Sequence, residues 1–103
     1  MSTDLKEKIV INSALKQEIE EPSKYHVIFL NDDTTPMDFV TGLLTIIFKH
    51  SQETAEKITL QIHTEGKAIV GTYTFEIAEQ KTCEATLCAR QQGFPLGIQM
   101  EKE

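Results

Sequence analysis

Apolar and polar positions follow one another along this chain in a pattern that predicts six structural elements. Apolar and β-branched runs predict strands at 25–30, 67–73 and 94–101. Apolar residues at helical spacing, together with capping residues, predict helices at 36–49, 52–64 and 75–92. The order β-α-α-β-α-β indicates an α+β domain in which three helices pack on a small three-stranded antiparallel sheet.

The ends of the predicted helices carry residues that suit these positions. The expected N-caps are Thr35, Ser51 and Thr74, and the expected terminators of the second and third helices are Gly66 and Gly93. Pro36 suits the first position of the first helix, because its missing N–H would be unsatisfied there anyway. Gly42 lies inside that helix and should cost about 1 kcal/mol relative to alanine, unless another group packs closely against it.

Residues 1–22 differ in composition from the rest of the chain. They mix charges with small apolar patches, and the segment Glu20-Glu21-Pro22-Ser23 interrupts the pattern. The sequence therefore predicts a flexible N-terminal extension over 1–22 and a folded domain over 23–103.

Length and charge exclude several classes of protein. The chain has 103 residues, enough for one small domain, and a formal net charge of -6, which argues against a nucleic-acid partner. No apolar run approaches the roughly 18 residues that a membrane helix needs, and no signal-peptide core is evident, so we expect a cytoplasmic protein. Cys83 and Cys88 lie five positions apart in a predicted helix, separated by about 7.5 Å and about 140°, so they should remain reduced core or boundary residues.

The most informative stretch follows the first predicted strand. Asn31, Asp32 and Asp33 place an amide and two carboxylates where that strand ends, just before a helix begins. Such oxygen-bearing side chains can recognise a cation or a metal ion. The alternative interpretation is a turn stabilised by Asn and Asp side chains, which is common at such positions.

Two motifs in this order resemble the ClpS family. The first is Leu-Asn-Asp-Asp-x-Thr-Pro-Met-acid-Phe-Val over 30–40, and the second is Ile-His-x-x-Gly-Lys-Ala over 62–68. ClpS proteins are adaptors that deliver substrates bearing N-degrons, that is, destabilising N-terminal residues, to the Clp AAA+ protease. The resemblance covers about residues 25–100, most of the chain.

The resemblance implies a role for each matching residue. Asn31, Asp32 and His63 would contact the free α-amine of the substrate, and Asp33 and Thr35 would hold the turn or the first peptide units. The pocket for the first side chain would be lined by Met37, Val40, Leu43, Thr59, Ile62 and Leu96. Such a pocket favours Leu, Phe, Tyr and Trp as the first residue.

One pocket position departs from the family pattern. Thr59 stands where many ClpS proteins have a methionine that acts as a gate against β-branched first residues. Because threonine is shorter, we expect Ile and Val N-termini to bind better than is usual.

The resemblance also implies partners. Glu76 and Lys81 match positions that contact the N-terminal domain of a ClpA- or ClpC-type unfoldase, and the N-terminal extension would be engaged by that unfoldase during substrate transfer. Without the resemblance, Glu76 and Lys81 would be interpreted as a solvated helix face.

Other functions remain as alternatives. The sequence contains no nucleotide-binding loop, nucleophile elbow or metal motif, so we expect a protein that is not an enzyme and needs no cofactor. A metal or acid–base site built from Asp32, Asp33 and His63 is one competing hypothesis. A structural protein-interaction module of similar fold, without N-degron binding, is the other.

Overall fold

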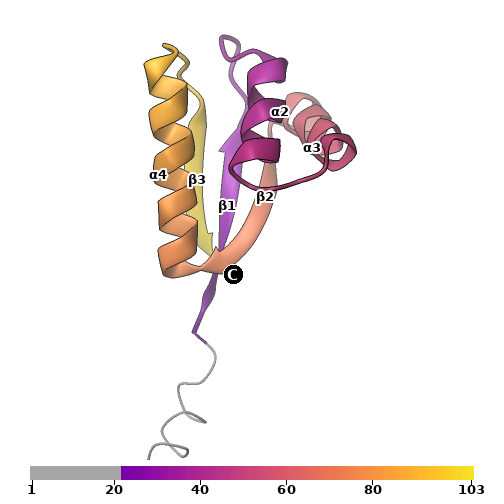
Figure 1. Cartoon of the computed structure of the whole chain (residues 1–103). Coiled ribbons are helices and arrows are strands. Elements are labelled where there is room, and N and C mark those ends of the chain that lie inside the picture. Colours follow the sequence, from indigo (N-terminus) through magenta and orange to yellow (C-terminus); the bar gives the residue numbers. More distant parts are fainter. Residues whose placement is uncertain (1–21) are drawn as a thin grey trace, which may run out of the picture.

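The computed structural model describes residues 22–103 and confirms the predicted order of elements (Figure 1). Its helices and strands are β1 (Lys24–Leu30), α2 (Met37–Ile46), α3 (Gln52–Glu65), β2 (Lys67–Thr74), α4 (Phe75–Gln91) and β3 (Gly97–Lys102). The predicted N-terminal extension, apart from Pro22, lies outside the described residues. None of the helices within 22–103 is long and apolar enough to cross a membrane.

The sheet has the order β2-β1-β3, with both pairs antiparallel. Strand β1 is central, and its Val27 and Phe29 side chains are completely buried. In Figure 1, α4 lies beside β3, and the α2–α3 pair lies on the other side of β1. Apolar side chains from all three helices join those of β1 in one core, so the folding of this small domain depends on a single hydrophobic cluster.

Two element ends differ from the prediction by more than one residue. Helix α2 ends at Ile46 rather than at residue 49, and Lys49 has a left-handed backbone conformation with φ 61°. Strand β3 begins at Gly97 rather than at residue 94. The Arg90 guanidinium donates hydrogen bonds to the carbonyls of Phe94 and Leu96, at 2.8 and 3.0 Å, and so holds this segment as a loop.

The predicted caps are confirmed at α3, Thr74 is the N-cap residue of α4 as predicted, and the prediction of Thr35 as the N-cap of α2 is wrong. The Ser51 hydroxyl accepts a hydrogen bond from the Thr54 N–H, and Gly66 ends α3 in a left-handed conformation with φ 90°. Thr74 occupies the N-cap position of α4 but makes no capping hydrogen bond through its side chain. At α2 the N-cap position is Pro36, whose carbonyl accepts a hydrogen bond from the Val40 N–H at 3.2 Å, and the Thr35 hydroxyl donates to Asp32 instead.

The two cysteines are free, as predicted. Cys88 is partly buried, as expected of a boundary residue. Cys83 lies exposed on α4, so the expectation that it is a core or boundary residue is wrong.

Candidate functional site

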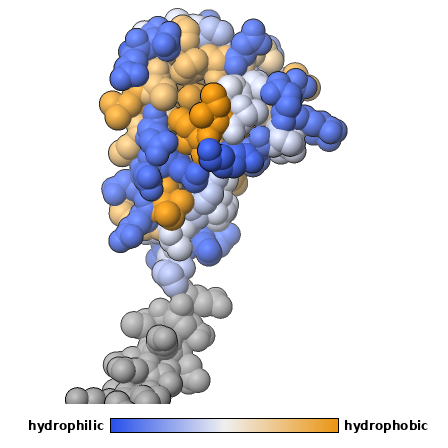
Figure 2. Space-filling view, in the orientation of Figure 1, coloured by the Kyte–Doolittle hydropathy of each residue, from blue (hydrophilic) through white to orange (hydrophobic). Residues whose placement is uncertain are grey.

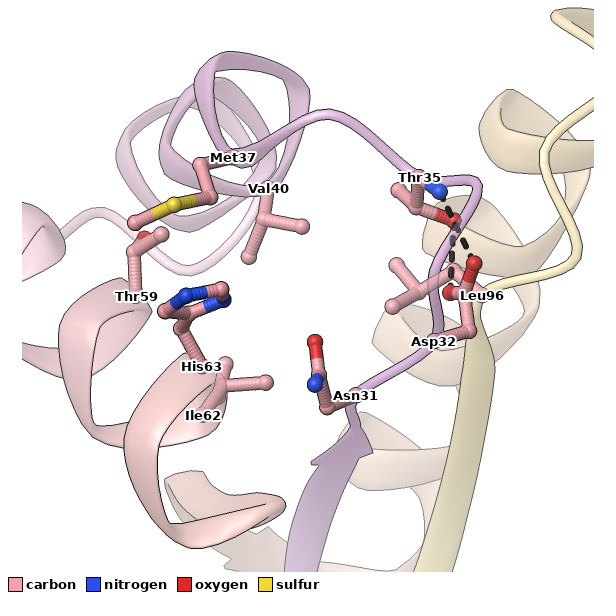
Figure 3. A pocket seen from close by; sticks show the side chains of 9 residues that line it. All are labelled: Asn31, Asp32, Thr35, Met37, Val40, Thr59, Ile62, His63 and Leu96. Atoms are coloured by element: carbon pink, nitrogen blue, oxygen red, sulfur yellow. Dashed lines mark hydrogen bonds between the residues drawn. The ribbon is translucent and has the colours of Figure 1, made fainter.

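The candidate site lies where the end of β1, the start of α2 and the end of α3 meet (Figure 3). The Asn31 N–H donates a hydrogen bond to the Gly66 carbonyl at 2.8 Å. Gly66 in turn caps α3 by donating to the Ile62 carbonyl at 2.9 Å. These two bonds tie the end of β1 to the last turn of α3, and they bring Asn31 near His63, although the two residues are distant in sequence.

The loop between β1 and α2 is organised by the Asp32 carboxylate. One oxygen accepts hydrogen bonds from the N–H groups of Thr34 and Thr35, both at 2.8 Å, and the other accepts the Thr35 hydroxyl at 2.7 Å. Desolvation acts to raise the pKa of Asp32, but the hydrogen bonds from Thr35 and Thr34, with the positive charge of Arg90, outweigh it and lower the pKa below its usual value. Asp32 is therefore an ionised residue at neutral pH.

The pocket joins this loop to an apolar wall. Its empty volume is about 250 Å³, including the open mouth. It is lined by Asn31, Asp32, Thr35, Met37, Val40, Thr59, Ile62, His63 and Leu96. The apolar members are contributed by α2, α3 and the loop before β3, and most are buried, whereas Met37 remains 43% exposed at the edge. A polar group and an apolar side chain could therefore be held side by side.

The polar side chains of the pocket have different orientations. Figure 3 shows the Asn31 amide pointing into the pocket and the His63 ring facing that amide. Neither side chain is hydrogen-bonded to another of the residues drawn. The Asp32 carboxylate turns toward Thr35 instead. Asn31 and a neutral His63 can thus offer acceptor atoms to a ligand, while Asp32 supplies negative charge from the loop.

Two of the predicted site residues do not line this pocket. Asp33 is exposed on the loop, and its side chain takes no part in the pocket wall. Leu43 is 5% exposed, and it borders a groove between α2 and α4. The expectation that Leu43 lines the pocket is therefore wrong for this structure, because six helical residues after Met37 it points about 120° away.

The groove beside Leu43 is larger than the pocket. Its empty volume is about 740 Å³, and its apolar lining includes Phe39, Leu43, Ile46 and Ile47. Figure 2 shows apolar surface gathered between α4 and α2. The polar side chains that line the groove are Asp38, Gln91 and Gln92, and they include no histidine.

Arg90 is a supporting residue that the sequence analysis missed. Its bond to the Leu96 carbonyl holds the loop that carries Leu96 into the pocket, and its charge acts on Asp32. An arginine near the end of a helix gives no local signal of either contact.

The two predicted partner residues differ in their surroundings. Glu76 is exposed in the first turn of α4. Lys81 is partly buried, and its ammonium donates to the Ile47 carbonyl at 2.7 Å, just past the end of α2. That ammonium also lies 5.3 Å from the Tyr73 ring centre and 5.8 Å from that of Phe48, within cation–π range. Lys81 therefore has a structural role of its own.

The competing metal hypothesis lacks a suitable cluster. Within residues 22–103, no group of three or more His, Cys, Asp or Glu side chains is arranged to hold a metal ion. Asp32, Asp33 and His63 accordingly do not form such a group.

Comparison with known proteins gives a consistent result. The family model described as ATP-dependent Clp protease adaptor protein ClpS matches residues 20–99. The Treponema denticola adapter protein ClpS is 40% identical over 99 residues, covering 96% of this chain and 98% of that protein. The protein of the same name from Vibrio cholerae is 45% identical over 87 residues, covering 84% of this chain and 82% of that protein.

A solved structure agrees with the sequence relatives. The structure of Agrobacterium tumefaciens ClpS2 bound to L-phenylalaninamide superposes with a TM-score of 0.78 at 40% identity, and the match covers 81% of this chain and all of that chain. The fold and the sequence thus lead to one assignment. The chain belongs to the ClpS family of ATP-dependent Clp protease adaptor proteins, which are adaptors and not enzymes.

Proposed function

We propose that this adaptor binds proteins through their free α-amine and first side chain and delivers them, in the cytoplasm, to a ClpA- or ClpC-type unfoldase for degradation by ClpP. The observation that carries the proposal is the junction of two kinds of surface in one pocket. Asn31 and His63 stand on one side, and apolar side chains stand on the other. Phenylalaninamide, the ligand of the related ClpS2, also has a free α-amine beside an apolar side chain.

The polar side suits an ammonium group. An α-ammonium has three N–H donors and a reference pKa of about 7.7–8.0, so it is largely charged at neutral pH. Asn31 offers a carbonyl oxygen, His63 a ring nitrogen, and Asp32 a negative charge. An N-acetylated peptide has neither the charge nor the three donors, and these acceptors would then be left without partners.

The apolar side suits a large first side chain. Burial of a Leu or Phe side chain contributes about 1.5–3 kcal/mol, which favours Leu, Phe, Tyr and Trp. Thr59 forms part of the wall and is 3% exposed. Because it is shorter than methionine, we propose that Ile and Val are accepted as well.

The partner surface is proposed on α4. Exposed Glu76 is available to an unfoldase N-terminal domain. For Lys81 we propose a double role, because its ammonium also holds the end of α2 in place. The engagement of residues 1–22 by the unfoldase rests on the family resemblance and lies outside the described residues.

The proposal is tested by fluorescence anisotropy with a labelled peptide that begins with Leu, prepared with a free and with an acetylated N-terminus. We expect binding of the free form and loss of at least about 100-fold in affinity on acetylation, as expected when buried polar groups lose their partners. Peptides beginning with Ile and Val belong in the same titration and should bind within about tenfold of Leu. Equal affinity for free and acetylated peptides, or no binding of either, would favour a structural module without N-degron recognition.

Binding should depend on pH in a bell-shaped manner. Protonation of the His63 ring would remove an acceptor and repel the ammonium, so affinity falls in acid. Above about pH 8 the amine loses its charge, and affinity falls again. The lowered pKa of Asp32 means that its charge is present above its ordinary value of 3.8 and is lost only as pH falls below that, so Asp32 stays ionised from pH 5 to 9.

The source of the acid limb is checked by measuring affinity from pH 5 to 9 in two variants. His63→Gln keeps a neutral acceptor and should lose the acid limb. His26→Gln changes a histidine on the sheet, bonded to Thr72 at 2.8 Å, and should keep it. Flat affinity of the unchanged protein over this range would contradict the mechanism.

A further inference from the structure

A buried hydroxyl lies in the wall of the otherwise apolar part of the pocket. Thr59 is the only polar residue within 22–103 that is buried, and it stands beside Met37 in Figure 3. Its hydroxyl donates to the Ala55 carbonyl, one turn earlier in α3, at 2.8 Å. An apolar first side chain would contact whichever group of Thr59, methyl or hydroxyl, faces the pocket.

The bond to Ala55 does not by itself decide which group faces the pocket. In a helix, threonine divides between two side-chain rotamers, because its hydroxyl can reach the preceding turn in both. Changing between them moves the hydroxyl and the methyl group to different positions. A second contact is needed to select one rotamer.

Thr41 on α2 provides that contact. Its hydroxyl oxygen lies 2.8 Å from the Thr59 hydroxyl oxygen and 3.0 Å from the Met37 carbonyl. Three contacts involve these hydroxyls: Thr59 with the Ala55 carbonyl, Thr41 with Thr59, and Thr41 with the Met37 carbonyl. The two hydroxyls have only two protons, so only two of these contacts can be hydrogen bonds at one time. When Thr59 donates to Ala55, Thr41 can donate to Thr59, and the Thr59 oxygen is then both donor and acceptor.

Thr41 does not line the pocket. It borders a separate hollow together with Asp38, Gly42 and two residues of α3. The Thr59 hydroxyl is thus directed toward two partners outside the pocket lining, which leaves its methyl group to face the pocket.

We propose that Thr41 is a specificity-determining positioning residue, which holds the Thr59 hydroxyl away from the pocket so that a methyl group meets the bound first side chain. This inference deepens the proposed N-degron function and rests on it. A polar hydroxyl facing an apolar ligand is less favourable than a methyl group, so a pocket with the other Thr59 rotamer would bind Leu, Ile and Val less well. Thr41 would therefore favour apolar first residues without touching them.

The test combines affinities with a direct measurement of the rotamer. In Thr41→Val the position beside Thr59 becomes apolar, so the Thr59 methyl turns toward it and the hydroxyl toward the pocket. If only about 10–30% of the molecules keep the competent rotamer, affinity for a Leu-initiated peptide falls about three- to tenfold. Three-bond NMR couplings of the Thr59 methyl carbon should change from the values of one rotamer to values averaged over two rotamers. A merely structural role of Thr41 would not change these couplings.

Two further variants make the test specific. In a Thr59→Val background no hydroxyl remains to turn, so adding Thr41→Val should change affinity by less than about 1.5-fold relative to Thr59→Val alone, a coupling that a double-mutant cycle measures. Thr45→Val removes a hydroxyl of the same helix that donates to Gly42, at 3.0 Å, and should leave affinity unchanged.

The outcomes separate this inference from the proposed function. If the unchanged protein binds the free Leu peptide but Thr41→Val does so equally well, or the Thr59 couplings stay the same, the inference is overturned and the proposed function stands. The inference would also be overturned if Thr41→Val lowered affinity as much in the Thr59→Val background as it does in the unchanged protein. If the unchanged protein does not bind the peptide, the proposed function fails and the inference fails with it.

Discussion

Replacing Asp32 with alanine is expected to weaken binding of a Leu-initiated peptide by about 30- to 100-fold, or about 2–3 kcal/mol. Both oxygens of this carboxylate accept hydrogen bonds from the loop that follows β1. Without them the loop is no longer held between Asn31 and Met37, and the negative charge that favours an ammonium is lost as well. Anisotropy titration of the free-amine peptide measures the effect.

Two variants separate the loop from the charge. Asp32→Asn removes the charge but retains an oxygen that can accept from Thr34 and Thr35, so its effect should be intermediate. Asp38→Ala removes a carboxylate from the first turn of α2, outside the pocket lining, and should change affinity by less than about twofold, as expected for exposed charges. If Asp32→Ala bound as well as Asp38→Ala, Asp32 would have no part in recognition.

The turn after β1 could be predicted because its hydrogen bonds are local. The sequence analysis left two interpretations of Asn31-Asp32-Asp33, a turn held by side chains and a site for a cation. The turn is confirmed, since Asp32 accepts from the N–H groups two and three residues later. The recognition of an amine stays a prediction. A single carboxylate can serve both purposes, so the two interpretations do not exclude each other.

The error at Leu43 has a geometric cause. Met37, Val40 and Leu43 are spaced by three residues, and each step of three turns the helix 60° short of a full rotation. Neighbouring members therefore share a face, while the first and third do not. Val40 lies in the pocket, and Leu43 lies in the core beside α4. A spacing rule that holds for pairs fails when it is extended over two turns.

Contacts between distant residues determine what the sequence pattern left unresolved. The Lys81 ammonium binds the Ile47 carbonyl, 34 residues earlier, where α2 has already ended. Arg90 binds the carbonyls of Phe94 and Leu96, so these residues form a loop rather than the start of β3. Neither contact leaves a periodic trace in the sequence. The order of elements, which depends on local periodicity, was accordingly predicted better than their ends.

Replacing Gly71 with alanine is expected to lower the free energy of unfolding by about 1–3 kcal/mol, the usual effect of adding a methyl group to a filled site. Gly71 pairs with Val27 at an irregularity of the β1–β2 register. A methyl carbon there would lie 2.5 Å from Cε2 and 2.6 Å from Cζ of Tyr73, so the tyrosine ring would have to move. That ring packs against Phe48 and under the Lys81 ammonium, and those contacts would be lost with it.

Urea unfolding of Gly71→Ala, Gly42→Ala, Tyr73→Leu and Tyr73→Leu/Gly71→Ala tests this cause of destabilisation. Gly42→Ala adds the same methyl group to the interior of α2, where no atom lies within 4 Å, so it should raise stability by about 0.5–1 kcal/mol. In a Tyr73→Leu background, Gly71→Ala should lower the free energy of unfolding much less, because the ring that the added methyl group displaces is gone. If Gly71→Ala lowered the free energy of unfolding equally with Tyr73 and with leucine at that position, the strain would lie in the backbone of β2 rather than in the tyrosine ring. The comparison therefore shows whether the aromatic cluster that surrounds Lys81 depends on the absence of a side chain at Gly71.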